Sequence, residues 1–280
     1  SLVPTVFIAF AVAEALGCRV GMFADTWLGR DGQLSAMQRA MRRLACRYFA
    51  QAFVGASMQT LNWYRHYNGG VGTKPFFLSS LCADNEHFKK IRNETMVDRS
   101  YDLMFSGRIV TLKNPVFFAE VAVEVRRRFG KCRVLVIGDG DPRLKSKMFR
   151  ILEDGGVDYH FPGFVKHLEL PRYYCQSKLL LFPTSGDCWG VVINEALVSG
   201  VPVITTQMTA AAGELVLDGQ NGYVLPLESG LWAEKAVTLL RDQDRWMAFS
   251  KSAEEMVESF TFEKAAQGII DAFEYLARSN

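Results

Sequence analysis

The strongest constraint on the fold is a regular alternation of strand-like and helix-like segments from Tyr101 onward. Short apolar runs with the composition of buried strands occupy 102–107, 132–140, 157–163, 178–183 and 201–206. The segments expected to form helices between and after them, several of them ended by glycine, occupy 114–130, 142–156, 168–177 and 190–200. Strands that alternate with helices predict right-handed crossovers and a parallel sheet covered on both faces.

The first hundred residues show the same alternation less clearly. We expect strands at 17–25 and 52–57, separated by a helix at 33–51 that carries Arg39, Arg43 and Arg47 on one side. This basic side is expected either to be solvated, which is the more common case, or to rest on anionic lipid.

The tail is expected to be helical, and its last helix places Ala266, Ile269, Ile270, Phe273 and Leu276 on one face. Such a stripe is usually part of a core. We therefore predict an α/β chain with two Rossmann-like domains. The predicted parts are a partial N-terminal domain at 1–100, a C-terminal domain at 101–260, and a helix at 261–280 that returns toward the N-terminal domain.

Composition excludes several classes of function. The 280 residues are 49% hydrophobic and 22% charged, which is typical of a soluble globular protein. The net charge of +2 does not indicate a nucleic-acid partner. The six cysteines are scattered without a C-x-x-C pair, which favours reduced thiols in the cytoplasm over disulfides or a zinc site. The longest apolar stretch, 2–13, is too short to span a bilayer.

The stretch "SGDCWGVVINEALVSG" (185–200) places Asp187 and Glu195 around a predicted helix start near Trp189. Ligands gather beyond the carboxyl ends of parallel strands, and the free N–H groups of a helix start attract phosphate. Residues 186–191 would supply those donors, and Glu195 lies about 9 Å further along the axis, where it could accept hydrogen bonds from a ribose diol. Two acids at this spacing are also compatible with solvent-exposed side chains on a helix surface that have no role in binding.

The segment "PTSGDCWGVVINEALVSGVPVI" resembles the E-x7-E motif of retaining GT-B glycosyltransferases of family 4, with Asp187 where Glu is usual. "FSGRIVTLKNP" is similar to the family's G-R-x4-K element, in which Arg108 and Lys113 match the residues that clamp the diphosphate. "VLVIGDGDPRLK" resembles its strand-glycine turn, and "VDYHFPGFV" its nucleobase element. "GELVLDGQNGYVL" resembles a further element, so that the resemblance covers about 101–245.

The resemblance implies a GT-B enzyme that moves a sugar, with retention, from a nucleotide sugar to a glycan, lipid or other acceptor. Envelope or polysaccharide biosynthesis is the expected setting. It implies no metal and no cofactor beyond the nucleotide-diphosphate sugar, and a cytoplasmic or inner-membrane-face location. Asp187 would lie at the sugar and Glu195 at the ribose. The implied catalytic residues are Arg108, Lys113 and Asp187. The implied donor-binding residues are Gly107, Gly138, Gly163, Phe164, Val165, Cys188, Trp189, Gly190, Val191 and Glu195.

The acceptor side resembles the family less closely. "FADTWLGRD" is similar to an H-D-x-W element in which Asp25 and Trp27 match and Ala24 replaces the histidine. The family's opening glycine-rich loop does not appear, so the N-terminal domain is expected to be incomplete. A related GT-B epimerase or phosphorylase, and a non-catalytic donor-binding subunit, remain alternatives. The four histidines, His66, His87, His160 and His167, are expected to be surface or structurally satisfied residues.

Overall fold

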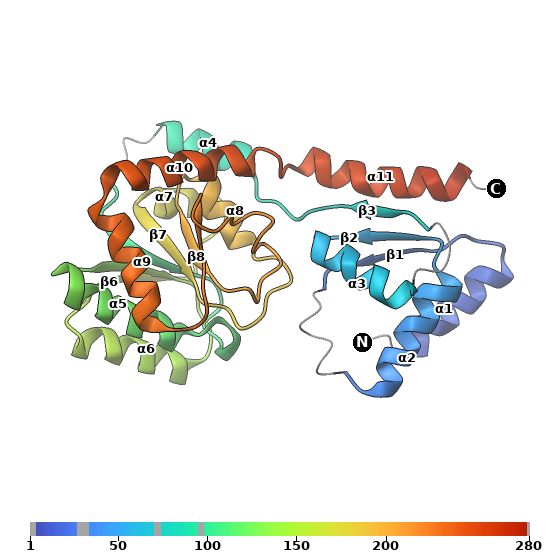
Figure 1. The fold of residues 1–280 in the computed structure, drawn as a ribbon, viewed down its shortest axis with the longest axis horizontal. Helices are drawn as coiled ribbons and strands as arrows, with labels where there is room; N and C mark the ends of the chain where they lie inside the picture. The colour runs from blue at the N-terminus through green and yellow to red at the C-terminus, as the bar shows by residue number, and fades with distance from the viewer. Residues whose placement is uncertain (1–3, 27–33, 70–73, 95–97, 279–280) are drawn as a thin grey trace. The chain divides into compact units, whose positions relative to one another are not determined.

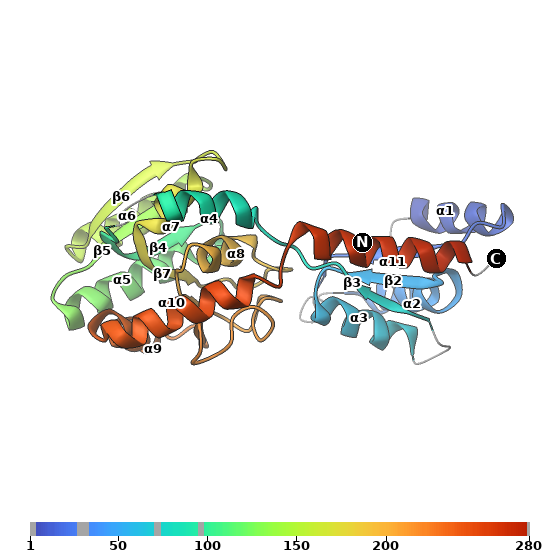
Figure 2. The ribbon, with the colours of Figure 1, turned by 90° about the horizontal axis from the view of Figure 1, so that it is seen from above.

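The computed structural model describes residues 4–26, 34–69, 74–94 and 98–278. The chain divides into two compact units, one of Ser1–Leu81 with Phe262–Asn280 and one of Cys82–Thr261. Figures 1 and 2 show the elements of both units.

The first unit is built on a three-stranded sheet of order β1-β2-β3, in which both neighbouring pairs are parallel. Its helical turn η2 is π-helical and directly continues α2, so the helix expected at 33–51 changes its winding after Leu44. The elements of this unit are α1 (Pro4–Ala15), β1 (Gly21–Ala24), α2 (Ala36–Leu44), η2 (Ala45–Phe49), β2 (Ala52–Gly55), α3 (Met58–Asn68), β3 (Phe76–Leu78) and α11 (Phe262–Arg278).

Helix α11 packs along the three strands of this sheet (Figure 1). The expectation that its apolar stripe is core is wrong, because Ile269, Ile270 and Phe273 are 38%, 47% and 68% exposed. The buried residues of α11 are instead Gly268 and Ala272. A Cβ at position 268 would lie 1.9 Å from the carbonyl oxygen of Leu78. The helix therefore meets the sheet through its smallest residues, which allow the two backbones to approach closely.

The second unit contains a six-stranded sheet of order β6-β5-β4-β7-β8-β9, and every neighbouring pair is parallel. The predicted alternation and parallel sheet are thus confirmed. The elements up to the middle of the sheet are α4 (Asn85–Glu94), β4 (Tyr101–Ser106), the 3-10 turn η3 (Thr111–Lys113), α5 (Pro115–Phe129), β5 (Arg133–Ile137), α6 (Pro142–Asp154) and β6 (Asp158–Gly163). The remaining elements are α7 (Leu170–Cys175), β7 (Ser177–Phe182), α8 (Val191–Val198), β8 (Val203–Thr205), β9 (Gly222–Val224), α9 (Ser229–Arg241) and α10 (Gln243–Val257).

Helix α4 lies before residue 100, yet it packs on α7 and α8 and so belongs to the second unit. The boundary between the units follows Leu81, whereas the sequence placed it after residue 100.

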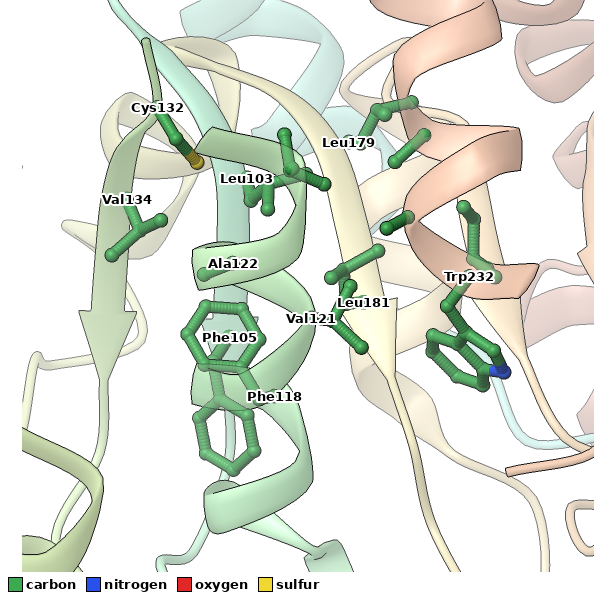
Figure 3. Close-up of a cluster of buried hydrophobic side chains, with 14 of the residues drawn as sticks. Leu103, Phe105, Phe118, Val121, Ala122, Cys132, Val134, Leu179, Leu181 and Trp232 are labelled. Atoms are coloured by element: carbon green, nitrogen blue, oxygen red, sulfur yellow. The ribbon is translucent and has the colours of Figure 1, made fainter. Parts of the chain in front are cut away.

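The main core fills the space between the central strands and helices α5 and α9 (Figure 3). Leu103, Phe105, Leu179 and Leu181 point into it from β4 and β7, against Phe118 and Trp232 of the helices. The alternate residues Met104 and Leu180 are also fully buried, on the opposite face of the sheet. Burial on both faces explains why these strands appear in the sequence as continuous apolar runs. This core anchors the strands whose carboxyl ends carry the candidate site.

The strand order reverses direction between β4 and β7, which are neighbours at the centre of the sheet. In open parallel sheets, ligands bind in the crevice at the carboxyl ends of the strands at such a switch point. The segment after β4 contains Arg108 and Lys113, and the segment after β7 contains Asp187. The topology therefore places these two loops at the crevice where a ligand is expected to bind. Within the described residues, no helix has the length and apolar character needed to cross a membrane.

Candidate active site

Lys113 and Asp187 meet between the two loops at the switch point. Lys113 ends the turn η3, is only 9% exposed, and forms an ion pair with the carboxylate of Asp187 through Nζ and Oδ2. Its ammonium group also lies 3.4 Å from Thr184 Oγ1 and 4.8 Å from the centre of the Phe182 ring. Two residues that were expected to be catalytic are thus placed in contact by the fold.

Asn114 joins these two loops. It adopts a left-handed backbone conformation with φ 48°, the only such non-glycine residue in the part of the chain that the structure describes. Its Nδ2 donates to the carbonyl oxygen of Pro183 at 2.8 Å and to Ser185 Oγ at 2.6 Å. The N–H of Ser185 donates in turn to the carbonyl oxygen of Leu112. The position of Lys113 relative to the loop after β7 therefore depends on its neighbour.

Replacement of Asn114 tests this junction. Asn114→Asp is expected to lower the free energy of unfolding by about 1–3 kcal/mol, because a carboxylate oxygen would replace the donor that faces the Pro183 carbonyl. Asn114→Gly, which tolerates the backbone conformation and adds no repulsion, should cost no more than about 1.5 kcal/mol. Urea unfolding of both variants measures the difference. Asn114→Asp should be the less stable of the two variants, and the opposite order or equal stability would show that the hydrogen bonds of the Asn114 side chain do not hold the two loops together.

Asp187 is held by the backbone on both sides. Its N–H donates to the Met208 carbonyl oxygen at 2.8 Å, and its Oδ1 accepts from the N–H of Trp189 at 3.0 Å. Thr209 Oγ1 donates to the Trp189 carbonyl oxygen. Both oxygens of the Asp187 carboxylate thus have partners, Oδ1 in the loop and Oδ2 on Lys113.

Helix α8 begins at Val191 rather than near Trp189, as the sequence had suggested. Gly190 precedes it with φ 91°, outside the helical range, and a Cβ there would lie 3.1 Å from the Phe182 ring. The N–H groups of Gly186, Asp187 and Trp189 already donate to protein oxygens. In the first turn of α8 the N–H of Ile193 already donates to the Gly190 carbonyl oxygen, which leaves the N–H groups of Val191 and Val192 to meet an anion at the helix start.

Trp189 and Cys188 are neighbours in the loop before α8 but differ in burial. The Trp189 side chain is 1% exposed, donates through Nε1 to Asn194 Oδ1 at 2.7 Å, and packs near the Phe260 ring. Its indole stabilises the loop before α8 and is not presented to solvent. Cys188 is half-buried, and Val191 is 37% exposed.

Glu195 lies within α8 and is 6% exposed. Its Oε2 accepts from the hydroxyl of Tyr174 at 2.6 Å, and its Oε1 lies 3.9 Å from His167 Nδ1. Burial raises the pKa of Glu195 to about 7, although the Tyr174 hydrogen bond lowers it. A buried carboxyl with a raised pKa beside a strand end is typical of a functional site.

The glycines at the carboxyl ends of β4, β5 and β6 have different surroundings. A Cβ on Gly138 would lie 1.9 Å from the carbonyl oxygen of Gly107, so Gly138 allows two loop backbones to touch. Gly107 and Gly163 have positive φ and open space where a Cβ would project. Phe164 is 79% exposed, and Val165 is 7% exposed. Close packing of two loops thus explains why position 138 is a glycine. At Gly163 the space where a Cβ would project is open.

The remaining expected residues are less constrained. Arg108 is exposed on the loop after β4. Asp25 is an exposed residue just after β1, in the first unit, and Trp27 lies outside the described residues. Among the described residues, no group of three or more His, Cys, Asp or Glu is arranged to hold a metal ion.

Sequence reasoning missed Asn114, Tyr174 and Thr184. Asn114 directly follows Lys113, and its left-handed conformation could not be inferred from its neighbours alone. Tyr174 lies in a short helix between two strands, and nothing in its local sequence indicates that it contacts Glu195.

Comparison with known proteins adds independent information. The sequence model of one protein family, described as Glycosyl transferases group 1, matches residues 100–242. An uncharacterised 41.2 kDa protein of the cps region of Klebsiella pneumoniae is 29% identical over 155 residues, which cover 55% of this chain and 40% of that protein. A UDP-N-acetylglucosamine–peptide N-acetylglucosaminyltransferase GtfA subunit of Streptococcus gordonii is 25% identical over 171 residues, 58% of this chain and 33% of that protein. The chain thus spans less than half the length of these relatives.

Solved structures show the same fold. The Anabaena protein HepE in complex with UDP superposes with a TM-score of 0.78 at 16% identity, over 96% of this chain and 75% of that chain. The pneumococcal O-GlcNAc transferase GtfA in complex with UDP and GlcNAc has a TM-score of 0.74 at 13% identity, over 97% and 55% of the two chains. The fold is therefore of the GT-B type.

Proposed function

This chain belongs to the family Glycosyl transferases group 1, and from that membership we propose that it transfers a sugar from a nucleotide-sugar donor to an acceptor with retention at the anomeric carbon. The observation that carries the proposal is the contact between Lys113 and Asp187 at the switch point of the second unit, with Glu195 in the helix that follows. Nucleotides bind at such points in doubly wound sheets.

Each of the three residues has a physical role in the proposed reaction. The bond between the anomeric carbon and the diphosphate oxygen breaks, and negative charge develops on the leaving diphosphate. Lys113, together with Arg108, would stabilise that charge. Asp187 would lie near the anomeric carbon, where positive charge develops. The acceptor oxygen bonds to that carbon as its proton passes to the leaving diphosphate oxygen. Glu195 would accept hydrogen bonds from the ribose hydroxyls.

The proposed reaction uses no metal ion, because the cations of Lys113 and Arg108 can take the place of one at the diphosphate. Turnover of the nucleotide sugar that persists in the presence of EDTA would support the proposal that no metal ion is needed. A glycan or lipid-linked acceptor and a role in envelope or polysaccharide biosynthesis are also proposed, in line with the cps-region relative.

We also propose that the protein acts in the cytoplasm, with peripheral contact at the inner membrane face through α2 and η2. The exposed Arg39, Arg43 and Arg47 support this contact, together with Met37 and Tyr48, which are 70% and 63% exposed. Co-sedimentation with anionic, but not neutral, vesicles would test it.

A second candidate function is a donor-binding subunit without turnover. It is favoured by Ala24, which replaces the histidine that is usual at this position of the H-D-x-W element. Turnover of a nucleotide sugar with a mixed pool of acceptors would reject this candidate.

The decisive experiment measures thermal stability with saturating UDP, GDP and ADP for the wild type and for Glu195→Ala. A nucleotide at one hundred times its Kd should add about 2.7 kcal/mol to the free energy of unfolding. The expected result is stabilisation of the wild type by one nucleotide and a smaller effect in the variant. If none of the three stabilises the wild type, a donor site for UDP, GDP or ADP in this chain is ruled out.

A further inference from the structure

We propose that Tyr174 is a positioning residue for Glu195, and that its hydroxyl fixes one carboxylate oxygen so that the other is presented to the ribose hydroxyls of the nucleotide. The proposal rests on the proposed function of Glu195 as the ribose-binding residue. It adds a residue from outside the matched motifs, located on α7 between β6 and β7.

The hydrogen bonds around Tyr174 have a defined direction. Its oxygen lies 2.6 Å from Glu195 Oε2 and 2.9 Å from Ser106 Oγ. A phenol has one proton to donate, whereas an ionised carboxylate can only accept. When Glu195 is ionised, Tyr174 therefore donates its single proton to Glu195, and the Ser106 hydroxyl donates to Tyr174. The 2.6 Å distance is typical of a charge-assisted bond between a hydroxyl and a carboxylate.

Three elements hold this chain of hydrogen bonds in place. Ser106 is the last residue of β4, Tyr174 lies on α7, and Glu195 lies on α8. Tyr174 is fully buried and Ser106 is 5% exposed, and the Phe88 ring of α4 packs 5.9 Å from the Tyr174 ring. The hydroxyl is consequently fixed relative to the end of β4, which is one side of the switch point.

The other carboxylate oxygen of Glu195 faces the more open side. Oε1 lies 3.9 Å from Nδ1 of His167, whose side chain is 52% exposed. The terminal torsion of a glutamate is broad and weakly restricted. Without the Tyr174 hydroxyl, the carboxylate could rotate away from the orientation in which it accepts two hydrogen bonds from a vicinal diol.

Tyr174 also affects the charge of Glu195. Burial raises the pKa of the carboxyl, and the Tyr174 hydrogen bond opposes that rise. The titratable groups that lie against the carboxyl are Tyr174 itself and His167, while β4 contributes the neutral hydroxyl of Ser106 through Tyr174. Removal of the hydroxyl should therefore shift the carboxyl further toward its protonated form at neutral pH, in which it accepts hydrogen bonds less well.

The test compares binding of UDP and 2′,3′-dideoxy-UDP by calorimetry, or the matching pair for GDP or ADP if the wild type binds that base instead. UDP is the first probe because the structural neighbour HepE binds it. Tyr174→Phe is expected to weaken UDP binding about tenfold, the loss expected for one hydrogen bond to a charged group. Its affinity for the dideoxy nucleotide should stay within about twofold, because that ligand lacks the hydroxyls that Glu195 would bind.

Tyr173→Phe is the matched control, since it removes the same hydroxyl from the adjacent residue of α7. Tyr173 stacks near His160 and does not contact Glu195 through any hydrogen bond among the described residues. It should leave both affinities unchanged. A second readout is the pH midpoint of UDP affinity, which should rise in Tyr174→Phe and stay in place in Tyr173→Phe.

The outcomes separate this proposal from the proposed function. If Tyr174→Phe weakens the affinity for UDP and for the dideoxy nucleotide equally, Tyr174 has a merely structural role and the positioning proposal is overturned. If Glu195→Gln abolishes the preference for UDP over the dideoxy nucleotide but Tyr174→Phe keeps it, the ribose role stands and the positioning role falls. If the wild type itself shows no such preference, both fall.

Discussion

Lys113→Ala is expected to lower turnover of the nucleotide sugar by about 10²–10³-fold, which is the usual effect of removing one group that stabilises developing negative charge. Lys113 is buried and held by Asp187 and Thr184, so that its charge is already oriented before any substrate binds. A preorganised cation in a dry site is worth more than one in water. The donor for the assay is the nucleotide sugar with the base that stabilises the protein.

A matched control is available in the same unit. Lys145 of α6 also forms an ion pair at 2.6 Å, but with Asp139, which is 60% exposed on the turn after β5. Lys145→Ala should leave turnover unchanged within about twofold, because exposed ion pairs contribute little. The catalytic assignment of Lys113 is incorrect if both variants behave alike. Circular dichroism must show that Lys113→Ala remains folded.

The stability of the free protein is expected to fall as pH rises from about 4.5 to about 7 because of Glu195. Its pKa is raised from 4.5 to about 7 in the folded protein, chiefly by burial. The folded state therefore holds its proton in a range where the unfolded chain has lost it. This contribution is fully present below pH 4.5 and is lost as pH rises through about 7. At about 1.4 kcal/mol per pH unit, the loss amounts to roughly 3 kcal/mol.

Other groups titrate in the same range, so the measurement is a difference between two proteins. Denaturant unfolding of the wild type and of Glu195→Gln at several pH values between 4.5 and 8 isolates the contribution of this carboxyl. The amide keeps the shape of the side chain and does not ionise. Parallel pH profiles of the two proteins would show that the carboxyl titrates normally. The saturating nucleotide of the thermal experiment must be absent.

The order of strands and helices in the second unit could be predicted because its information is local. Each central strand is buried on both faces and therefore appears as an apolar run, as in 178–183. Glycines mark the ends of several helices, such as Gly130 with φ 87° after α5. These features depend on residues that are near one another in the chain.

Faces and boundaries were harder to predict. The apolar stripe of α11 indicated a core, but the helix packs through Gly268 and Ala272 because the backbone of β3 comes too close for larger residues. The start of α8 was placed too early, since Gly190 adopts a positive φ that composition does not reveal.

The sequence by itself determined the alternation of elements, the parallel sheet, and the motif that contains Asp187 and Glu195. Only the tertiary structure decided which side chains meet. Lys113 and Asp187 are 74 residues apart, and Tyr174 and Glu195 are 21 apart. Their contacts depend on the strand order, which makes β4 and β7 neighbours, and on the left-handed turn at Asn114. Both arise from packing between distant segments, and no local pattern of residues encodes them.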